Sequence, residues 1–223
     1  MADPVKVFLD ANVLAKPLTR TLLIIGGPPS GFVPVWSERA IAEADRHLGS
    51  GKTPVRHLVT RFGWEIAHTG DPAGRFSATD DTDRQLLADA EAAEVSFLVS
   101  EDVDDVDEAD LVSVGISAVN PDLFLSVRLT TGGYQEALET IGASRQRPPS
   151  TPEAIHAALG RNHPLLATRF ESLYPGVDVA ERVQAEPLVT FRGARCLGCG
   201  TMPTSAGDLI RGMGPRCRGV TDR

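Results

Sequence analysis

The first 130 residues alternate between short apolar runs and longer stretches with helical periodicity. The runs VKVFL at 5–9 and VSFLV at 95–99 are typical of buried strands, and each leads into an acidic segment. Helical periodicity follows Ser37, which we expect to be an N-cap, and appears again after Thr82. Strands that alternate with helices predict βαβ units and a parallel sheet covered by helices on both faces, an α/β fold.

The chain is long enough for a domain of ordinary size and smaller appendages. We expect residues 1–130 to form the α/β domain, with a third apolar run from Leu111 to Val119 that stops at a turn signal. Residues 131–176 are expected to form a helical extension with a linker near 144–152. Residues 190–223 contain all three cysteines and form a third, smaller unit.

The net charge is −8, which disfavours a polyanionic partner, but the charges are unevenly placed. Residues 101–110 carry seven carboxylates, whereas residues 192–223 carry six arginines and two aspartates. Local basic segments can still bind nucleic acid. The apolar runs are too short to cross a bilayer, and the N-terminus does not resemble a signal peptide, so we expect a cytoplasmic protein with no membrane partner.

Acidic residues follow the first two expected strands. Asp10 directly follows one strand and Asp102 lies just beyond the other. Ligands collect at the carboxyl ends of parallel strands, so neighbouring strands would bring these carboxylates together. The alternative is that both are turn or N-cap residues, which aspartate also favours.

A third acid lies on a helix. Asp83 precedes Leu86, Leu87 and Ala90 by three, four and seven residues, which predicts that it shares their core-facing stripe. A carboxylate there is costly unless it is paired, coordinates a cation or caps the helix. On the helix after Ser37, Glu43 and Glu38 flank the apolar stripe, and periodicity does not choose between them.

Several carboxylates at one site would repel one another without a cation. Ligation by oxygen alone suits Mg²⁺ or Mn²⁺, which can polarise a phosphodiester and orient an attacking hydroxide. We therefore expect a metal site that promotes hydrolysis of phosphodiester bonds.

Four segments together resemble the motifs of PIN domains over about residues 5–130. FLDANVL at 8–14 resembles the opening strand, WSERAIAEADRHL the second-helix motif, DDTDRQLLADA the third motif and FLVSEDVDD the fourth. The register implies that Asp10, Glu43, Asp83 and Asp102 are the catalytic, metal-binding acids, with Asp105 as a substitute or assistant for Asp102. Ser100 fits the serine or threonine that often lies two residues before the last acid. Glu101 is an unusual extra charge.

The resemblance implies a three-layer α/β/α fold and Mg²⁺- or Mn²⁺-dependent endoribonuclease activity. Many bacterial members are toxins of VapC-type toxin–antitoxin pairs, so RNA, an antitoxin protein and a homodimer are the partners that it implies. The RNA target stays open. A flap nuclease acting on DNA would use the same acids but needs helical arch segments, and none is evident in the sequence.

The three cysteines, Cys196, Cys199 and Cys217, form a C-x₂-C pair followed by a third cysteine. They resemble a short zinc-ribbon module with a structural zinc ion. Asp208, Asp222, a histidine or water would supply the fourth ligand. A tail with reduced cysteines and a redox pair are the alternatives.

Arginines surround this cysteine segment and are candidates for phosphate contacts. The ones we single out are Arg195, Arg211, Arg216 and Arg218. They define the competing hypothesis for the whole chain, a non-catalytic protein that binds nucleic acid or a partner through this arginine-rich segment. A solubilising surface would have the same composition.

Overall fold

A five-stranded, mostly parallel sheet forms the centre of the protein. The computed structural model describes residues 3–49, 51–144, 150–181, 189–198 and 200. The strand order is β2-β1-β3-β4-β5, in which β5 alone runs antiparallel to its neighbour β4. The strands are β1 Val5–Leu9, β2 Phe32–Val35, β3 Phe97–Val99, β4 Ser117–Val119 and β5 Phe191–Gly193.

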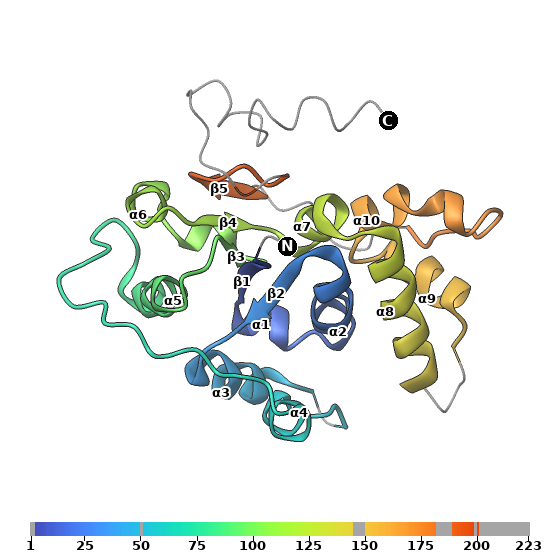
Figure 1. The fold of residues 1–223 in the computed structure, drawn as a ribbon, viewed down its shortest axis with the longest axis horizontal. Helices are drawn as coiled ribbons and strands as arrows, with labels where there is room; N and C mark the ends of the chain where they lie inside the picture. The colour runs from blue at the N-terminus through green and yellow to red at the C-terminus, as the bar shows by residue number, and fades with distance from the viewer. Residues whose placement is uncertain (1–2, 50, 145–149, 182–188, 199, 201–223) are drawn as a thin grey trace.

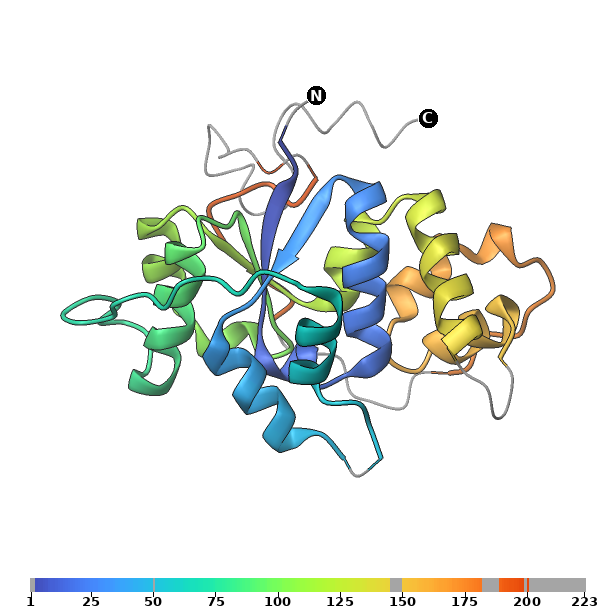
Figure 2. The ribbon, with the colours of Figure 1, turned by 60° about the horizontal axis from the view of Figure 1, so that its bottom comes forward.

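Helices lie on both sides of the sheet. Helices α5 and α6 lie on one side, and α2 and α7 lie on the other (Figures 1 and 2). On the second side, the ring of Phe124 from α7 packs against Phe32 and Phe97, which belong to two different strands. The helices around the sheet are α1 Ala11–Leu14, α2 Pro17–Gly26, α3 Glu38–His47, α4 Val55–Phe62, α5 Asp81–Ala92, α6 Glu108–Ser113 and α7 Pro121–Arg128.

Local capping explains where several helices begin. The Ser37 hydroxyl accepts a hydrogen bond from the Ala40 amide at 3.3 Å, so α3 begins where the sequence predicts. Asn120 caps α7 in the same way through the Asp122 amide, with Pro121 in the first turn. The expected helix after Thr82 is confirmed as α5, which begins one residue earlier.

The apolar run from Leu111 to Val119 is not one continuous strand. Its first part belongs to α6, which Asp107 caps by accepting from the Ala109 amide, and only β4 at its end is extended. Gly115, at a φ of 67°, lies between the two. The helix is favoured because acidic residues occupy its capped first turn and Leu111 alone turns into the core.

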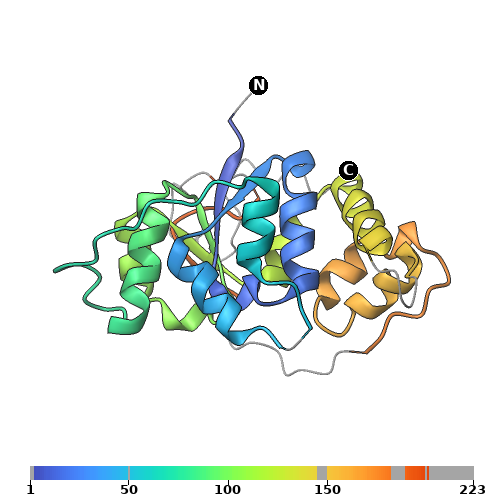
Figure 3. The same ribbon diagram turned by 90° about the horizontal axis from the view of Figure 1, so that it is seen from below.

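The helical extension is built against the α/β domain. It contains α8 Thr131–Ser144, α9 Pro152–Leu159 and α10 Pro164–Arg169, with the expected break at His163-Pro164. These helices gather at the right of Figures 1 and 3. Their buried side chains, among them Leu138, Leu159 and Leu166, belong to the same apolar core as the sheet.

The segment expected to open the cysteine module contributes β5 to the edge of the sheet. Residues 191–193 pair with β4, so this part of 190–223 extends the central sheet. In the part of the chain that the structure describes, no helix has the length and apolar character needed to cross a membrane.

Candidate functional site

The strand order reverses between β1 and β3, and the site lies there. The connection after β1 leads to β2 on one side, whereas the later strands β3 and β4 lie on the other side of β1. In open α/β sheets, such a switch point leaves a crevice beyond the carboxyl ends of the two central strands. Leu9 pairs with Val99, so Asp10 and Ser100 follow the two strands side by side, and Asp10 lines a cleft of about 480 Å³.

Asp10 divides its two carboxylate oxygens between two partners. Oδ1 accepts from the Ala11 amide at 2.6 Å and caps α1, while Oδ2 accepts from the Ser100 hydroxyl at 2.7 Å. Asp10 is therefore both the N-cap of α1, as the alternative interpretation predicts, and a residue of the cleft. Burial raises the pKa of Asp10 from 3.8 to about 6, and the nearby Glu43 and Asp102 also raise it, against the lowering effect of these hydrogen bonds.

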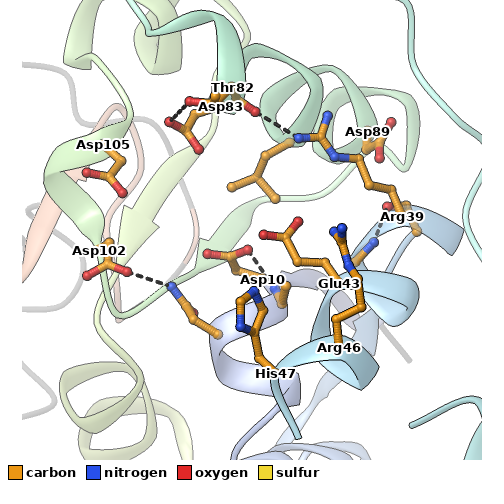
Figure 4. A pocket seen from close by; sticks show the side chains of 15 residues that line it. Asp10, Arg39, Glu43, Arg46, His47, Thr82, Asp83, Asp89, Asp102 and Asp105 are labelled. Carbon is orange, nitrogen blue, oxygen red and sulfur yellow. Dashed lines mark hydrogen bonds between the residues drawn. The ribbon is translucent and has the colours of Figure 1, made fainter.

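Asn12 connects Asp10 to Asp102 through Ser100. Its amide nitrogen donates to the Ser100 hydroxyl oxygen and to Oδ2 of Asp102, both at 3.1 Å. Its amide oxygen accepts from the Glu101 backbone at 3.3 Å, and Ser100 also accepts from the Asp102 amide. The two expected acids at the strand ends are thus oriented by one hydrogen-bonded network. Figure 4 shows the carboxylates of Asp10 and Asp102 in the cleft.

Glu43 and Glu38 lie in different surroundings on α3. Glu43 is half-buried and lines the cleft, where Figure 4 shows its carboxylate beside that of Asp10. Glu38 is exposed and forms an ion pair with Arg56 of α4. The packing of α4 against α3 therefore separates two glutamates that helical periodicity leaves equivalent.

Asp83 lines the cleft instead of facing the core. It is half-buried, and its carboxylate accepts from the Thr82 hydroxyl at 3.0 Å. The expected core-facing placement is wrong because the stripe is buried only at Leu87 and Ala90, while Leu86 lines the cleft with Asp83. The neighbouring Asp81 points away and pairs with Arg84 at 2.6 Å.

Asp105 completes the acidic wall of the cleft. It lies in the 3₁₀ turn Val103–Asp105, one turn beyond Asp102. Partial burial raises the pKa of Asp105, and Asp102 and Asp83 raise it further. This shared influence places the three carboxylates within electrostatic reach of one another, as Figure 4 also shows.

These acids have the donor chemistry that a hard divalent cation prefers. Five of the six carboxylates that line the cleft, Asp10, Glu43, Asp83, Asp102 and Asp105, offer oxygen atoms to a cation, whereas the sixth, Asp89, is buried. Burial is the main cause of the raised pKa values of Asp10 and Asp105, and neighbouring carboxylates raise these values further. Within the described ranges, no three acidic, histidine or cysteine side chains are already gathered as a closed metal-binding group. Mg²⁺ commonly uses one or two protein carboxylates and keeps several waters, so the residues fit an ion held partly through water.

Glu101 does not add an unbalanced charge to this edge. Its carboxylate pairs with Lys16 at 2.9 Å, and both side chains are partly exposed. The pair joins the start of α2 to the segment after β3. A partly exposed ion pair contributes little to the free energy of unfolding. We therefore assign to the Lys16–Glu101 pair a local role, which is to hold the segment that carries Asp102.

Several residues of the cleft were not predicted from the sequence. The signal for Asn12 is its place two residues after the strand-end acid. Arg39, Arg46 and His47 could have been found from their helical spacing to Glu43. Asp89 lines the cleft as well, but its carboxylate accepts from the Gly70 amide and from Gln85. It therefore fastens the segment before α5.

The structure reaches only the beginning of the cysteine segment. Cys196 is buried, and its carbonyl accepts from the Gly200 amide at 2.8 Å. Cys199 and Cys217 lie outside the described residues, as do Arg211, Arg216 and Arg218. The zinc site and these arginine contacts stay predictions.

Arg195 is already occupied by contacts within the protein. Its guanidinium donates to the carbonyls of Gly115 and Gly200. The expected phosphate contact would have to replace these bonds, so in this structure Arg195 fastens the C-terminal segment to the sheet.

The fold and the cleft together define an α/β protein with an acidic crevice at the switch point of its sheet. No family model, curated protein or solved structure matches the chain. Its function is therefore inferred from the site and from the motifs that shape it.

Proposed function

We propose that this protein is a PIN-type endoribonuclease that hydrolyses RNA phosphodiester bonds with Mg²⁺ or Mn²⁺. The observation that carries the proposal is the meeting of five carboxylates, apart from the buried Asp89, from four separate segments in one cleft. They come from the end of β1, from α3, from α5 and from the turn after β3. Such a group of carboxylates at the switch point offers a divalent cation the oxygen ligands that it prefers, and this favours metal-dependent chemistry.

Asp10 and Asp102 are the residues we assign to direct metal binding, because both are oriented by the Ser100 and Asn12 network. Glu43, Asp83 and Asp105 face the same space and would act through ordered water. A bound Mg²⁺ or Mn²⁺ ion would supply Lewis-acid activation of the phosphodiester and of the attacking water.

The protein side chains then have two tasks. Asp10 and Asp102 would hold the metal ion at the place where the reacting phosphate binds, and Glu43 is placed to accept a proton from the attacking water. No protein nucleophile is required. In-line attack by water breaks the bond to the 3′-oxygen and leaves a 3′-hydroxyl and a 5′-phosphate.

RNA is the substrate class that the four PIN-like motifs favour. Their acids are the ones that line the cleft, in the order that the resemblance implies. A toxin of a toxin–antitoxin pair is the biological role we propose within this class. The antitoxin and the homodimer stay predictions.

The decisive experiment uses matched substitutions on one helix. We expect Glu43→Gln to slow Mn²⁺-dependent cleavage of total RNA by about 10²–10⁴-fold, the range for a group that transfers a proton in the transition state. Glu38→Gln, on the same helix but outside the cleft, should leave the rate nearly unchanged. Asp10→Asn should abolish cleavage, and excess EDTA should do the same to the wild type.

Circular dichroism and thermal melting would verify that each variant folds, and mapping of the RNA ends would identify the expected 5′-phosphate. Cleavage that survives both Asp10→Asn and Glu43→Gln in folded protein would overturn the proposal. RNA binding without any metal-dependent cleavage by the wild type would instead support the non-catalytic binding hypothesis.

A further inference from the structure

One wall of the acidic cleft is basic. Arg39, Arg46 and His47 line it from the same helix that carries Glu43. They lie four residues before, three after and four after Glu43, so helical geometry places all four side chains on one face of α3. Figure 4 shows Arg46 and His47 on the α3 side, Arg39 reaching to Thr82, and Asp102 and Asp105 across the cleft.

The donors of this basic face are largely open. Arg39 is exposed and gives one hydrogen bond, from Nη2 to the Thr82 carbonyl at 2.9 Å, out of the five N–H groups of a guanidinium. Arg46 and His47 are exposed, and neither side chain forms a hydrogen bond or ion pair with another residue that the structure describes. Both also lie in the last turn of α3, where a positive charge stabilises the helix dipole. That local effect would not require them to line the cleft.

We propose that Arg39, Arg46 and His47 bind the phosphates that flank the scissile phosphate of a single-stranded RNA. This inference rests on the proposed nuclease function and names how the same site holds its substrate. Arg39 and Arg46 are seven residues apart, about 10 Å along the helix axis, and Glu43 lies between them. A strand whose reacting phosphate lies near Glu43 and Asp10 therefore has basic donors on both sides.

The charge of the opposite wall favours one strand over two. The half-buried Asp83 and the exposed Asp102 and Asp105 line it. The second backbone of a duplex would lie against these charges, whereas a single strand lies along α3 and avoids them. The protein carries a net charge of −8, so the binding energy must come from this local group.

The test measures binding separately from cleavage. The probe is a fluorescein-labelled oligouridylate of about a dozen nucleotides, followed by fluorescence anisotropy with the full-length protein in Ca²⁺, a hard cation that neutralises carboxylates. Arg46→Gln and His47→Gln should each weaken binding by about fivefold, and the double variant by more. The slope of log K against log salt should fall by about 0.7 for each lost phosphate contact.

Arg161→Gln is the matched control, since Arg161 is exposed and follows α9 at the other end of the molecule. It removes one positive charge and should change neither the affinity nor the salt slope. Thermal melts should verify that Arg46→Gln and His47→Gln are folded, as expected for exposed side chains.

Several outcomes would overturn the inference. Unchanged affinity and salt slope in the double variant would exclude the basic face while leaving Mn²⁺-dependent cleavage, and so the proposed function, intact. Equal loss in Arg161→Gln would assign the effect to net charge alone. Tighter binding of duplex than of single-stranded RNA would contradict the assignment to one strand. If the wild type binds RNA through this face but never cleaves it, the face keeps its role in binding phosphates, whereas the proposed function and the scissile phosphate between these contacts fall.

Discussion

At the scale of single residues, the cleft depends on small polar groups that hold the acids. Ser100 is buried, donates to Asp10 and accepts from the amides of Asn12 and Asp102. Asn12 in turn is the residue whose side chain reaches Asp102. The exposed carboxylate of Asp102 would otherwise sample several rotamers, so its position is decided by a neutral neighbour.

We expect Asn12→Ala to weaken metal binding without removing any metal ligand. Loss of an orienting partner of this kind typically costs about 10–100-fold in metal affinity or activity. The concentration of Mn²⁺ that gives half-maximal cleavage should therefore rise, and saturating Mn²⁺ should restore part of the rate. An Mn²⁺ titration of the variant that overlays that of the wild type would contradict this role.

At the scale of whole elements, each helix is specified locally but oriented by its neighbours. The N-cap of α3 at Ser37 can be read from the sequence. Which of its glutamates enters the cleft depends on α4, because Arg56 binds Glu38 and leaves Glu43 facing Asp10. The same applies to α5, where Arg84 holds Asp81 and the carbonyls of the preceding segment while Asp83 remains in the cleft.

Helix α10 begins at a buried histidine and is capped from another helix. The Asp122 carboxylate of α7 accepts from the amides of Leu165 and Leu166, both at 3.0 Å. His163 lies just before them, with Nε2 bonded to Thr19 at 2.9 Å and Nδ1 3.9 Å from Asp122. Burial lowers the pKa of His163 from 6.5 to about 4, and the charge of Lys16 lowers it further, so the imidazole is neutral at pH 7.

This histidine should make folding sensitive to acid. Its pKa is lower in the folded than in the unfolded protein, so its contribution is fully present above pH 6.5 and is lost as the pH falls toward 4. We expect a loss of about 3 kcal/mol in the free energy of unfolding across that range. Urea denaturation between pH 7 and pH 4 should show a shallower decline for His163→Gln, which keeps a polar partner for Thr19. Parallel curves would contradict the assignment.

At the scale of the whole molecule, the helical extension is joined to the sheet domain by a close helix contact. Helix α8 packs on α2 where two glycines face each other. A Cβ atom on Gly133 would lie 2.6 Å from the carbonyl oxygen of Gly26, too close for any side chain without movement of the helices. The absence of a side chain at this position therefore sets the distance between the two parts.

A pair of adjacent glycines tests this contact. Gly133→Ala should destabilise the protein by about 1–3 kcal/mol, because the added methyl group meets backbone on α2. Gly132→Ala places the same methyl group in open space on the same helix and should stabilise the protein by about 0.5 kcal/mol through helix propensity. Denaturant melts of both variants measure the difference. Equal effects would show that the glycine contact does not join the two parts.

The sequence alone was sufficient for the features that depend on neighbouring residues. Apolar runs predict β1 and β3, a capping serine with helical periodicity predicts α3, and the helical pattern of the sequence predicts α5 and α8, because these forces act within a few residues. It also places Asp10 and Asp102 beyond strand ends. The split of residues 111–119 into helix and strand was missed, since apolar character does not report backbone conformation.

Only the tertiary structure decided how these pieces meet. Strand order depends on pairing between distant residues, and it alone brings Asp10 beside Ser100 at the switch point. Packing between helices selects Glu43 over Glu38 and turns Asp83 to the cleft. The basic side chains of α3 likewise become part of a site only in the folded protein, because acids from other elements line the opposite side of the same cleft.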